Sequence, residues 1–290
     1  MPHPAHAAMR EATRGPRRRR RPAPASRETE AGTHPRGLDI ERVADRDEGA
    51  EPRGIVGSEP RFDLGEDDAA PTIGRDEMHA YAERAVCLTI VNPNNPDGRI
   101  VERSRLLALH DSLAQHGGML IVDEAFADVA PEVSVAAVAG AASGHKLIVL
   151  RSFGKFFGLA GLRLGFIVAA PALAATIRGL IGEWPVCSDA LAAGLAAYAD
   201  GRWMDRERAI LHKSAQRLDD LLTRSGFELA GGTSLFRLAR AADARERFTR
   251  LLAAGILVRP FDFAPDLLRF GLPRGREQWR RLAVALSARA

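Results

Sequence analysis

A glycine-rich turn carrying Lys155 lies between two apolar, strand-like runs, residues 147–150 and 164–169. The first run is short, is β-branched at two positions and gives way to Ser152 and Gly154, which is typical of a buried parallel strand that ends in a loop. Ligands of open α/β sheets bind at the carboxyl ends of the strands. The pattern therefore predicts an α/β chain that presents a lysine at the ligand-binding edge of its sheet.

The lysine in this turn can act as a nucleophile. The chain has only three lysines, Lys146, Lys155 and Lys213, against a large excess of arginine. A lysine amine forms a Schiff base with a carbonyl group, whereas an arginine side chain stays protonated in proteins. The alternative is a surface lysine that extends its ammonium group into solvent, and the turn alone supports both interpretations equally.

Two further apolar runs also end in polar residues. Residues 86–91 lead into Asn-Pro-Asn-Asn-Pro-Asp-Gly-Arg at 92–99, a dense cluster of turn formers. Residues 119–122 lead into Asp-Glu-Ala-Phe at 123–126, so a carboxylate follows directly on a buried run. Because a buried carboxylate requires a cationic partner, the second strand end predicts a paired acid close to the lysine.

These motifs, in this order, resemble those of fold-type I pyridoxal-phosphate enzymes of the class I and II aminotransferase group. The third motif is Ser-x-x-Lys at 152–155, followed by Gly-x-Arg-x-Gly at 161–165. The resemblance extends from about residue 85 to the C-terminus. It implies an α/β fold with a mixed-sheet large domain, N-terminally incomplete here, and a smaller C-terminal α/β domain.

The resemblance also implies a site for pyridoxal 5'-phosphate. The catalytic residues would be Lys155, similar to the lysine that binds this cofactor covalently, and Asp123, similar to the acid that pairs with the pyridine nitrogen. Asn95 is similar to the donor to the cofactor's ring oxygen. Ser152 and Arg163 are similar to residues that bind its phosphate, which suits a hydroxyl donor and a guanidinium fork.

Two further site positions follow from the resemblance. Phe126 stands where these aminotransferases usually carry a tyrosine, so it would pack beside the cofactor without donating a hydrogen bond. Arg269, in the run 267–271, is similar to the arginine that binds the substrate α-carboxylate. Arg259 and Arg274 compete for that role, and a lone arginine in a short apolar run is more often salt-bridged within its sheet.

Within the family, the asparagine motif and Asp-Glu-Ala-Phe-Ala-Asp at 123–128 resemble the threonine-phosphate decarboxylase branch. This implies a carboxy-lyase of cobalamin biosynthesis that converts L-threonine O-3-phosphate to (R)-1-amino-2-propanol O-2-phosphate. Two alternatives stay open: an aminotransferase similar to the histidinol-phosphate enzyme, which would use the same residues, and an inactive truncated remnant. Because fold-type I enzymes usually build each site from two subunits, the resemblance implies a homodimer.

Residues 1–80 differ in composition from the rest of the chain. They contain nine prolines, no lysine and only eleven strongly apolar residues, which favours disorder. The basic run 17–21 could contact nucleic acid, but acids outnumber arginines in this segment and a solvated run is preferred. Residues 56–59 are the nearest counterpart of the family's phosphate-cradling turn. We expect a disordered or out-of-frame segment, then a partial cofactor-binding domain at 81–185 and a small domain at 186–290.

Alternating helices and strands are predicted after the lysine turn. A proline in its first turn starts a helix at 171–181, and a serine cap starts the next one, at 188–199. A long amphipathic helix at 206–225 ends at Gly226. The remaining expected elements are strands at 227–230, 235–238, 256–259 and 267–270, and helices at 242–254 and from 276.

Charge, cysteines and hydropathy limit the classes of function. From residue 81 onward the chain has twenty-seven basic and twenty-one acidic residues, a balance that suits anionic, phosphorylated ligands as easily as nucleic acid. The small phosphorylated amino-acid substrate is what the resemblance implies. Cys87 and Cys187 are the only cysteines, so we expect a reducing cytoplasm and neither a disulfide framework nor a zinc site. No apolar run approaches the roughly twenty residues that cross a bilayer. We expect no nucleic-acid or membrane partner, no metal, and surface positions for His110 and His116.

Overall fold

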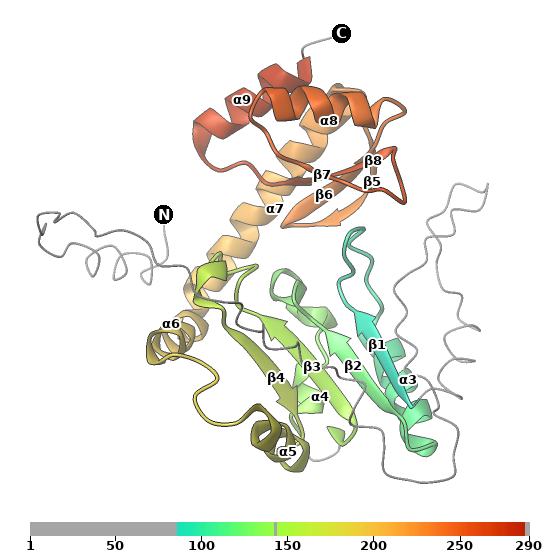
Figure 1. The fold of residues 1–290 in the computed structure, drawn as a ribbon, viewed down its shortest axis with the longest axis vertical. Coiled ribbons are helices and arrows are strands. Elements are labelled where there is room, and N and C mark those ends of the chain that lie inside the picture. Colours follow the sequence, from blue (N-terminus) through green and yellow to red (C-terminus); the bar gives the residue numbers. More distant parts are fainter. Residues whose placement is uncertain (1–85, 142–143, 288–290) are drawn as a thin grey trace, which may run out of the picture. The chain divides into compact units, whose positions relative to one another are not determined.

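The computed structural model describes residues 86–141 and 144–287, all within one compact unit of the chain (Figure 1). Two four-stranded sheets organise these residues. The predictions of a disordered or out-of-frame segment at 1–80, of the basic run at 17–21 and of the turn at 56–59 fall outside the described residues.

The first sheet has the strand order β1-β2-β3-β4 (Figure 1). Its parallel strands are β1 (Cys87–Val91), β2 (Met119–Asp123) and β3 (Leu147–Ser152). The last strand, β4 (Gly165–Ala169), is antiparallel to β3. Each strand matches a predicted apolar run to within two residues. The short helices of this region are η2 (Ala127–Val129), η3 (Pro131–Val133), α4 (Ala136–Ala139) and η5 (Ala160–Leu162).

Helix α3 (Arg103–Gln115) connects β1 to β2 and packs on the sheet. Three of its leucines repeat at the helical period and are buried against the strands: Leu106, Leu109 and Leu113. His110 is only 5% exposed, so the prediction of a surface histidine is wrong at this position, whereas His116 is exposed. The His110 Nε2 lies 3.1 Å from the His145 carbonyl oxygen, and this hydrogen bond satisfies a ring that packing has buried.

Three helices follow β4: α5 (Pro171–Ile181), α6 (Ser188–Ala199) and α7 (Gly201–Arg224). The predicted serine cap of α6 is wrong, because Ser188 is already helical and the cap residue, Cys187, makes no side-chain hydrogen bond. Helix α7 begins at residue 201 and not at 206. Its cap is Asp200, whose carboxylate accepts a hydrogen bond from the Trp203 N–H at 2.9 Å.

The second sheet is antiparallel, in the order β5-β6-β8-β7 (Figure 1). Its strands are β5 (Glu228–Thr233), β6 (Phe236–Arg240), β7 (Arg259–Pro260) and β8 (Leu267–Gly271). Strand β7 is shorter than the predicted 256–259, because the Ile256 N–H bonds to the Leu251 carbonyl at 2.8 Å and closes the preceding helix. The helices of this part are α8 (Ala244–Ala253) and α9 (Gly275–Ser287).

A separate core lies between the second sheet and its helices. The largest contributions come from α7, α8, β8 and α9, through Leu218, Leu222, Leu251, Phe270, Trp279 and Leu282. None of the helices within residues 86–141 and 144–287 is long and apolar enough to span a bilayer. Helix α7, the longest, instead alternates buried leucines with charged residues, as an amphipathic helix does.

Candidate active site

Strands β1 and β2 of the first sheet end at the same level, and β3 continues two residues beyond it. In the register of the sheet Val91 pairs with Asp123, and Asp123 pairs with Leu150. Asp123 is the last residue of β2 and Ser152 the last of β3. The polar residues that follow the three strands are therefore collected at one edge, where ligands of open α/β sheets bind.

Residues 92–99 form a loop, here called the asparagine loop, that β1 leads into. Two of its three asparagines support the loop itself: the Asn92 side chain exchanges hydrogen bonds with the Val101 N–H and carbonyl, and Asn94 Nδ2 donates to Asp97 Oδ1 at 2.8 Å. The third, Asn95, accepts a hydrogen bond at Oδ1 from Arg269 Nη1. No described residue accepts a hydrogen bond from Asn95 Nδ2.

Three glycines allow the asparagine loop to pack on β5 of the second sheet. The Gly232 N–H donates to the Asp97 carbonyl at 2.7 Å. A Cβ atom on Gly98 would overlap the backbone of Gly232, and one on Gly231 would overlap the Asp97 carbonyl. All three glycines have positive φ angles, and residues other than glycine adopt such angles only at a cost in free energy. This backbone contact brings Asn95 beside Arg269.

Arg269 is held on two sides. Its guanidinium bonds to Asn95 and lies over the Phe236 ring, 5.1 Å from the ring centroid. Burial and the neighbouring charge of Arg259 lower the pKa of Arg269. Arg259 itself is exposed and lies over Phe261, 5.3 Å from the ring centroid.

Arg274, the third arginine considered for carboxylate binding, follows β8 and lies elsewhere at the site. Its guanidinium is close to Gly158, in the turn that contains Lys155. A Cβ atom built on Gly158 would stand 3.1 Å from Arg274 Nη2. Arg269 is thus the one of the three that contacts the asparagine loop.

Lys155 belongs to the lysine turn, residues 153–163, between β3 and β4. Its Nζ lies over the Phe126 ring, 5.5 Å from the centroid. Phe126 is buried and meets Phe236 edge to face, with centroids 5.2 Å apart. The described residues include no carboxylate that pairs with Lys155. The two aromatic rings therefore connect the lysine to Arg269, with a cation at either end.

The remaining predicted site residues lie at the same edge but make few contacts. Asp123 Oδ1 accepts a hydrogen bond from the Ala125 N–H at 2.9 Å, and no described donor bonds to Oδ2. Ser152 pairs with Gly165 across the sheet. Arg163 is exposed, has a φ of 51° and makes only a long hydrogen bond, 3.4 Å, to a carbonyl of its own turn. Nothing in the described structure joins Asp123, Ser152 or Arg163 directly to one another.

A buried ion-pair network behind the edge was not predicted. Arg151 donates to Glu124 and to Asp128, each at 3.0 Å. Burial raises the pKa of Asp128, against the opposing charges of Arg151 and Arg208. Burial and the neighbouring Asp128 charge also raise the pKa of Tyr198 to about 12. A buried carboxylate requires a cationic partner. The same argument that was made for Asp123, if made for Glu124, would have predicted this network.

A second unpredicted feature is an aromatic cluster that supports the lysine turn. Phe153, Phe156 and Phe157 of the turn are buried. Phe153 stacks on Phe157 with centroids 4.5 Å apart, and Phe157 stacks on Trp203 of α7 at 5.8 Å. The sequence could have predicted this cluster, because three phenylalanines within five residues of one turn are expected to pack against one another.

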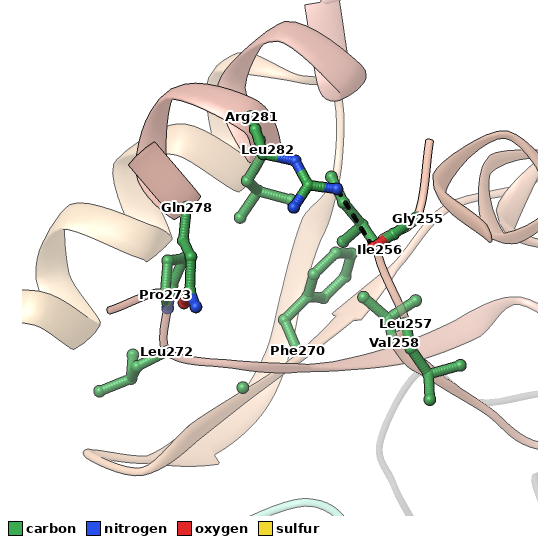
Figure 2. A pocket seen from close by; sticks show the side chains of 11 residues that line it. Gly255, Ile256, Leu257, Val258, Phe270, Leu272, Pro273, Gln278, Arg281 and Leu282 are labelled. Atoms are coloured by element: carbon green, nitrogen blue, oxygen red, sulfur yellow. Dashed lines mark hydrogen bonds between the residues drawn. The ribbon is translucent and has the colours of Figure 1, made fainter. Parts of the chain in front are cut away.

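Figure 2 shows a pocket of about 340 Å³ in the second sheet, away from these residues. Its polar side chains are already used: Arg281 Nη2 donates to the Ala254 and Gly255 carbonyls, and Gln278 Oε1 accepts from the Arg274 N–H at 2.6 Å. None of the predicted site residues lines it. Within the part of the chain that the structure describes, no group of three or more His, Cys, Asp or Glu is placed to hold a metal ion.

Comparison with known proteins identifies the class. Residues 72–286 match the family model for aminotransferase class I and II, and the chain belongs to this family. Solved structures share its fold: a histidinol-phosphate aminotransferase from Sinorhizobium meliloti in complex with pyridoxal-5'-phosphate superposes with a TM-score of 0.65 at 23% identity, covering 76% of this chain and 61% of that one. The predicted fold-type I α/β class is confirmed.

Curated relatives carry two names. The chain is 42% identical over 216 residues to a threonine-phosphate decarboxylase of Pseudomonas aeruginosa, and 46% identical over 199 residues to one of Sinorhizobium sp. These matches cover 74% and 68% of this chain, which spans only 63% and 58% of the two relatives. A histidinol-phosphate aminotransferase of Methylobacillus flagellatus is 33% identical, over 72% of this chain and 57% of that protein.

Proposed function

We propose that this protein is a pyridoxal-phosphate-dependent carboxy-lyase. Its substrate would be L-threonine O-3-phosphate and its product (R)-1-amino-2-propanol O-2-phosphate, in cobalamin biosynthesis. The observation that carries this proposal is the identity of 42% and 46% to proteins named threonine-phosphate decarboxylase, against 33% to a histidinol-phosphate aminotransferase.

The groups at the sheet edge fit pyridoxal phosphate. Lys155 has no carboxylate partner among the described residues, and the Asp123 carboxylate keeps one oxygen that no described donor contacts. An unpaired lysine and an unpaired acid on neighbouring strand ends suit a cofactor with an aldehyde and a basic ring nitrogen. Ser152 and Arg163, on the two sides of the lysine turn, would hold its phosphate.

When bound, the cofactor supplies an electron sink for the electron pair left on the substrate Cα. Asp123, ionised, would keep the ring nitrogen protonated. Lys155 would hold the cofactor and would deliver a proton to the substrate Cα. Asn95 would donate from Nδ2 to the ring oxygen, and Phe126 would pack beside the ring, because it lacks the hydroxyl of a tyrosine.

Arg269 would decide which bond at Cα breaks. A guanidinium that binds the substrate carboxylate fixes the direction of that group, and this direction would decide whether the carboxylate or the Cα proton is lost. Asn95 and Phe236 hold the Arg269 side chain, which supports a fixed carboxylate position. In an aminotransferase the Cα proton would be lost, and Lys155 would remove it. The same residues serve both reactions, so an assay must separate them.

The test begins with the visible absorbance of the purified protein mixed with pyridoxal phosphate. We expect a band that Lys155→Ala abolishes and that the matched variant Lys213→Ala, at an exposed lysine of α7, retains. Carbon dioxide release from threonine phosphate, without a new amino acid when 2-oxoglutarate is added, would support the lyase. A new amino acid would instead support the aminotransferase. A folded wild-type protein that gives no band would support the inactive remnant.

The same proposal includes the assembly and the domain division. We propose a homodimer, as expected for fold-type I enzymes, with residues 81–185 as the cofactor-binding domain and 186–290 as the small domain. Cys87 and Cys187 are free thiols, which agrees with a reducing cytoplasm. The oligomeric part is tested by light scattering at several protein concentrations, where a constant monomer mass would contradict it.

A further inference from the structure

Arg151 joins the ends of β2 and β3 directly behind the candidate site. It donates from Nη1 to Glu124 Oε2 and from Nη2 to Asp128 Oδ1, each at 3.0 Å. The Arg151 side chain is 16% exposed, and the two carboxylates are 0% and 1% exposed. Because protein carboxylates occupy both ends of its fork, this arginine is committed to the protein and not to a ligand.

The two strand ends that Arg151 joins are the ones that carry the candidate catalytic residues. Glu124 directly follows Asp123, and Arg151 directly precedes Ser152 and lies four residues before Lys155. A shift of either strand end would therefore change the separation of the acid and the lysine. The Arg151 bridge opposes such a shift, because its planar guanidinium fixes two carboxylates in one geometry.

Further contacts anchor the bridge on both sides. Glu124 also accepts hydrogen bonds from the Ser134 hydroxyl at 2.6 Å and from a backbone N–H at 2.7 Å. Arg208 Nε donates to the Asp128 carbonyl at 2.8 Å, and the Arg208 guanidinium lies over Phe156, the residue after Lys155. The network thus reaches the lysine turn by a second route, through α7.

We propose that Arg151 is a positioning residue that sets the separation between Asp123 and Lys155. The inference rests on the proposed cofactor chemistry but concerns a side chain that touches neither cofactor nor substrate. A lysine at this position would keep the charge and lose the bidentate geometry. Arg151→Lys is therefore the informative substitution.

The matched control is Arg247→Lys in α8. Arg247 is similarly buried, 18% exposed, and its guanidinium also makes two hydrogen bonds, to Asp243 and to the Ser225 carbonyl, both at 2.5 Å. We expect both variants to lower the melting temperature. Only Arg151→Lys should weaken pyridoxal-phosphate binding, by at least about tenfold, and shift the pH midpoint of the visible band, because only it changes the geometry of the site.

A readout without cofactor separates this inference from the proposed function. In hydrogen exchange of the cofactor-free protein, Arg151→Lys should speed the amides of residues 153–158 by about tenfold or more relative to Arg247→Lys, because a local opening there becomes easier. If the wild type binds no cofactor, the proposed function fails and this exchange result alone decides the positioning role. Should Arg151→Lys not fold, Asp128→Asn removes one arm of the bridge and takes its place. Unchanged exchange in the turn, with unchanged affinity and midpoint where a band exists, would overturn the proposal.

Discussion

Lys155 and Asp123, at the edge of the first sheet, differ from charged residues of the second sheet in whether their charges are compensated. Arg237 of β6 pairs with Asp219 of α7, through two hydrogen bonds of 2.5 and 2.8 Å. At the first sheet's edge Lys155 has no described carboxylate partner, and Asp123 has one oxygen without a described donor. Paired charges stabilise a fold, whereas unpaired ones are retained for a ligand. The difference agrees with a ligand site at the edge of the first sheet.

The largest expected effect distinguishes the buried network behind the edge from a surface pair. Glu124→Ala leaves Arg151 with only one of its two carboxylate partners and leaves the Ser134 hydroxyl and a buried backbone N–H without their acceptor, so it should cost about 3–5 kcal/mol of unfolding free energy. Asp243→Ala, whose carboxylate side chain is 38% exposed, should cost at most about 1 kcal/mol. Urea unfolding measures both. Equal losses would contradict the distinction between the two regions.

The second largest expected effect is that of replacing Asp123, the acid at the end of β2. Asp123→Ala should lower kcat by about 10²–10³-fold, because it removes the carboxylate that would stabilise the charge that develops in the reaction. Its melting temperature should stay near that of the wild type, since the carboxylate gives up one hydrogen bond, to the Ala125 N–H. Asp219→Ala should show the reverse, a lower melting temperature with kcat retained. An Asp123 variant that loses stability but not activity would remove this residue from the site.

A smaller effect tests the contact between the two regions. Gly98→Ala meets both a positive φ of 73° and the Gly232 backbone. Gly117→Ala has a similar φ of 79°, but its Cβ atom would face only the end of the flexible Lys146 side chain, at 3.5 Å. Gly117→Ala should cost about 1–2 kcal/mol for the backbone angle, and Gly98→Ala about 1–3 kcal/mol more for the collision. Equal destabilisation in urea titrations would mean that the loop does not pack on β5.

The smallest expected effect is that Asp128 and Asp243 contribute to the pH dependence of stability with opposite signs. The folded-state pKa of Asp128 is raised, so its contribution is fully present below its ordinary pKa of 3.8 and is lost as the pH rises through the raised value. The hydrogen bond from Arg247 lowers the pKa of Asp243, so its contribution is present above 3.8 and is lost as the pH falls through the lowered value.

Replacement by asparagine removes each contribution in turn. Relative to the wild type, Asp128→Asn should gain stability as the pH rises, and Asp243→Asn should gain stability as the pH falls. Unfolding free energies measured from about pH 3 to pH 7 check the sign of both slopes. Slopes of the same sign would show that the two carboxylates do not differ in environment.

The local sequence pattern was sufficient to predict most helices and strands, because short apolar runs and turn residues mark where these elements begin and end. The apolar runs that became β1 to β4 are short and bounded by turn residues, and helix α5 starts at the proline that predicted it. The start of α7 was missed because its cap, Asp200, lies before the amphipathic pattern begins. His110 was misplaced because the contact that accommodates its buried ring, the hydrogen bond to the His145 carbonyl, joins residues 35 positions apart and leaves no local signal.

The arrangement of the site could not be predicted from the spacing of residues in the sequence, because it depends on contacts between distant parts of the chain. Arg259, Arg269 and Arg274 have similar local surroundings, and the bond to Asn95 that distinguishes Arg269 joins residues 174 positions apart. The pairing of Arg151 with Glu124 is likewise created by the alignment of two strand ends. Motifs therefore indicated which residue types collect at the edge, and the tertiary structure determined which of them touch.

The packing of Trp203 has an optical consequence. This indole is 9% exposed and stacks on Phe157 within the lysine turn, whereas Trp184 is 89% exposed. A chromophore bound at Lys155 would stand close to the buried indole and would absorb its emission. Buried tryptophan emits the blue-shifted part of the intrinsic fluorescence, and Trp203 shares this part with Trp279 of α9, which is 7% exposed. A partial loss of the blue-shifted emission would then report occupancy of the site, and the red-shifted part from Trp184 would serve as an internal reference within the same molecule.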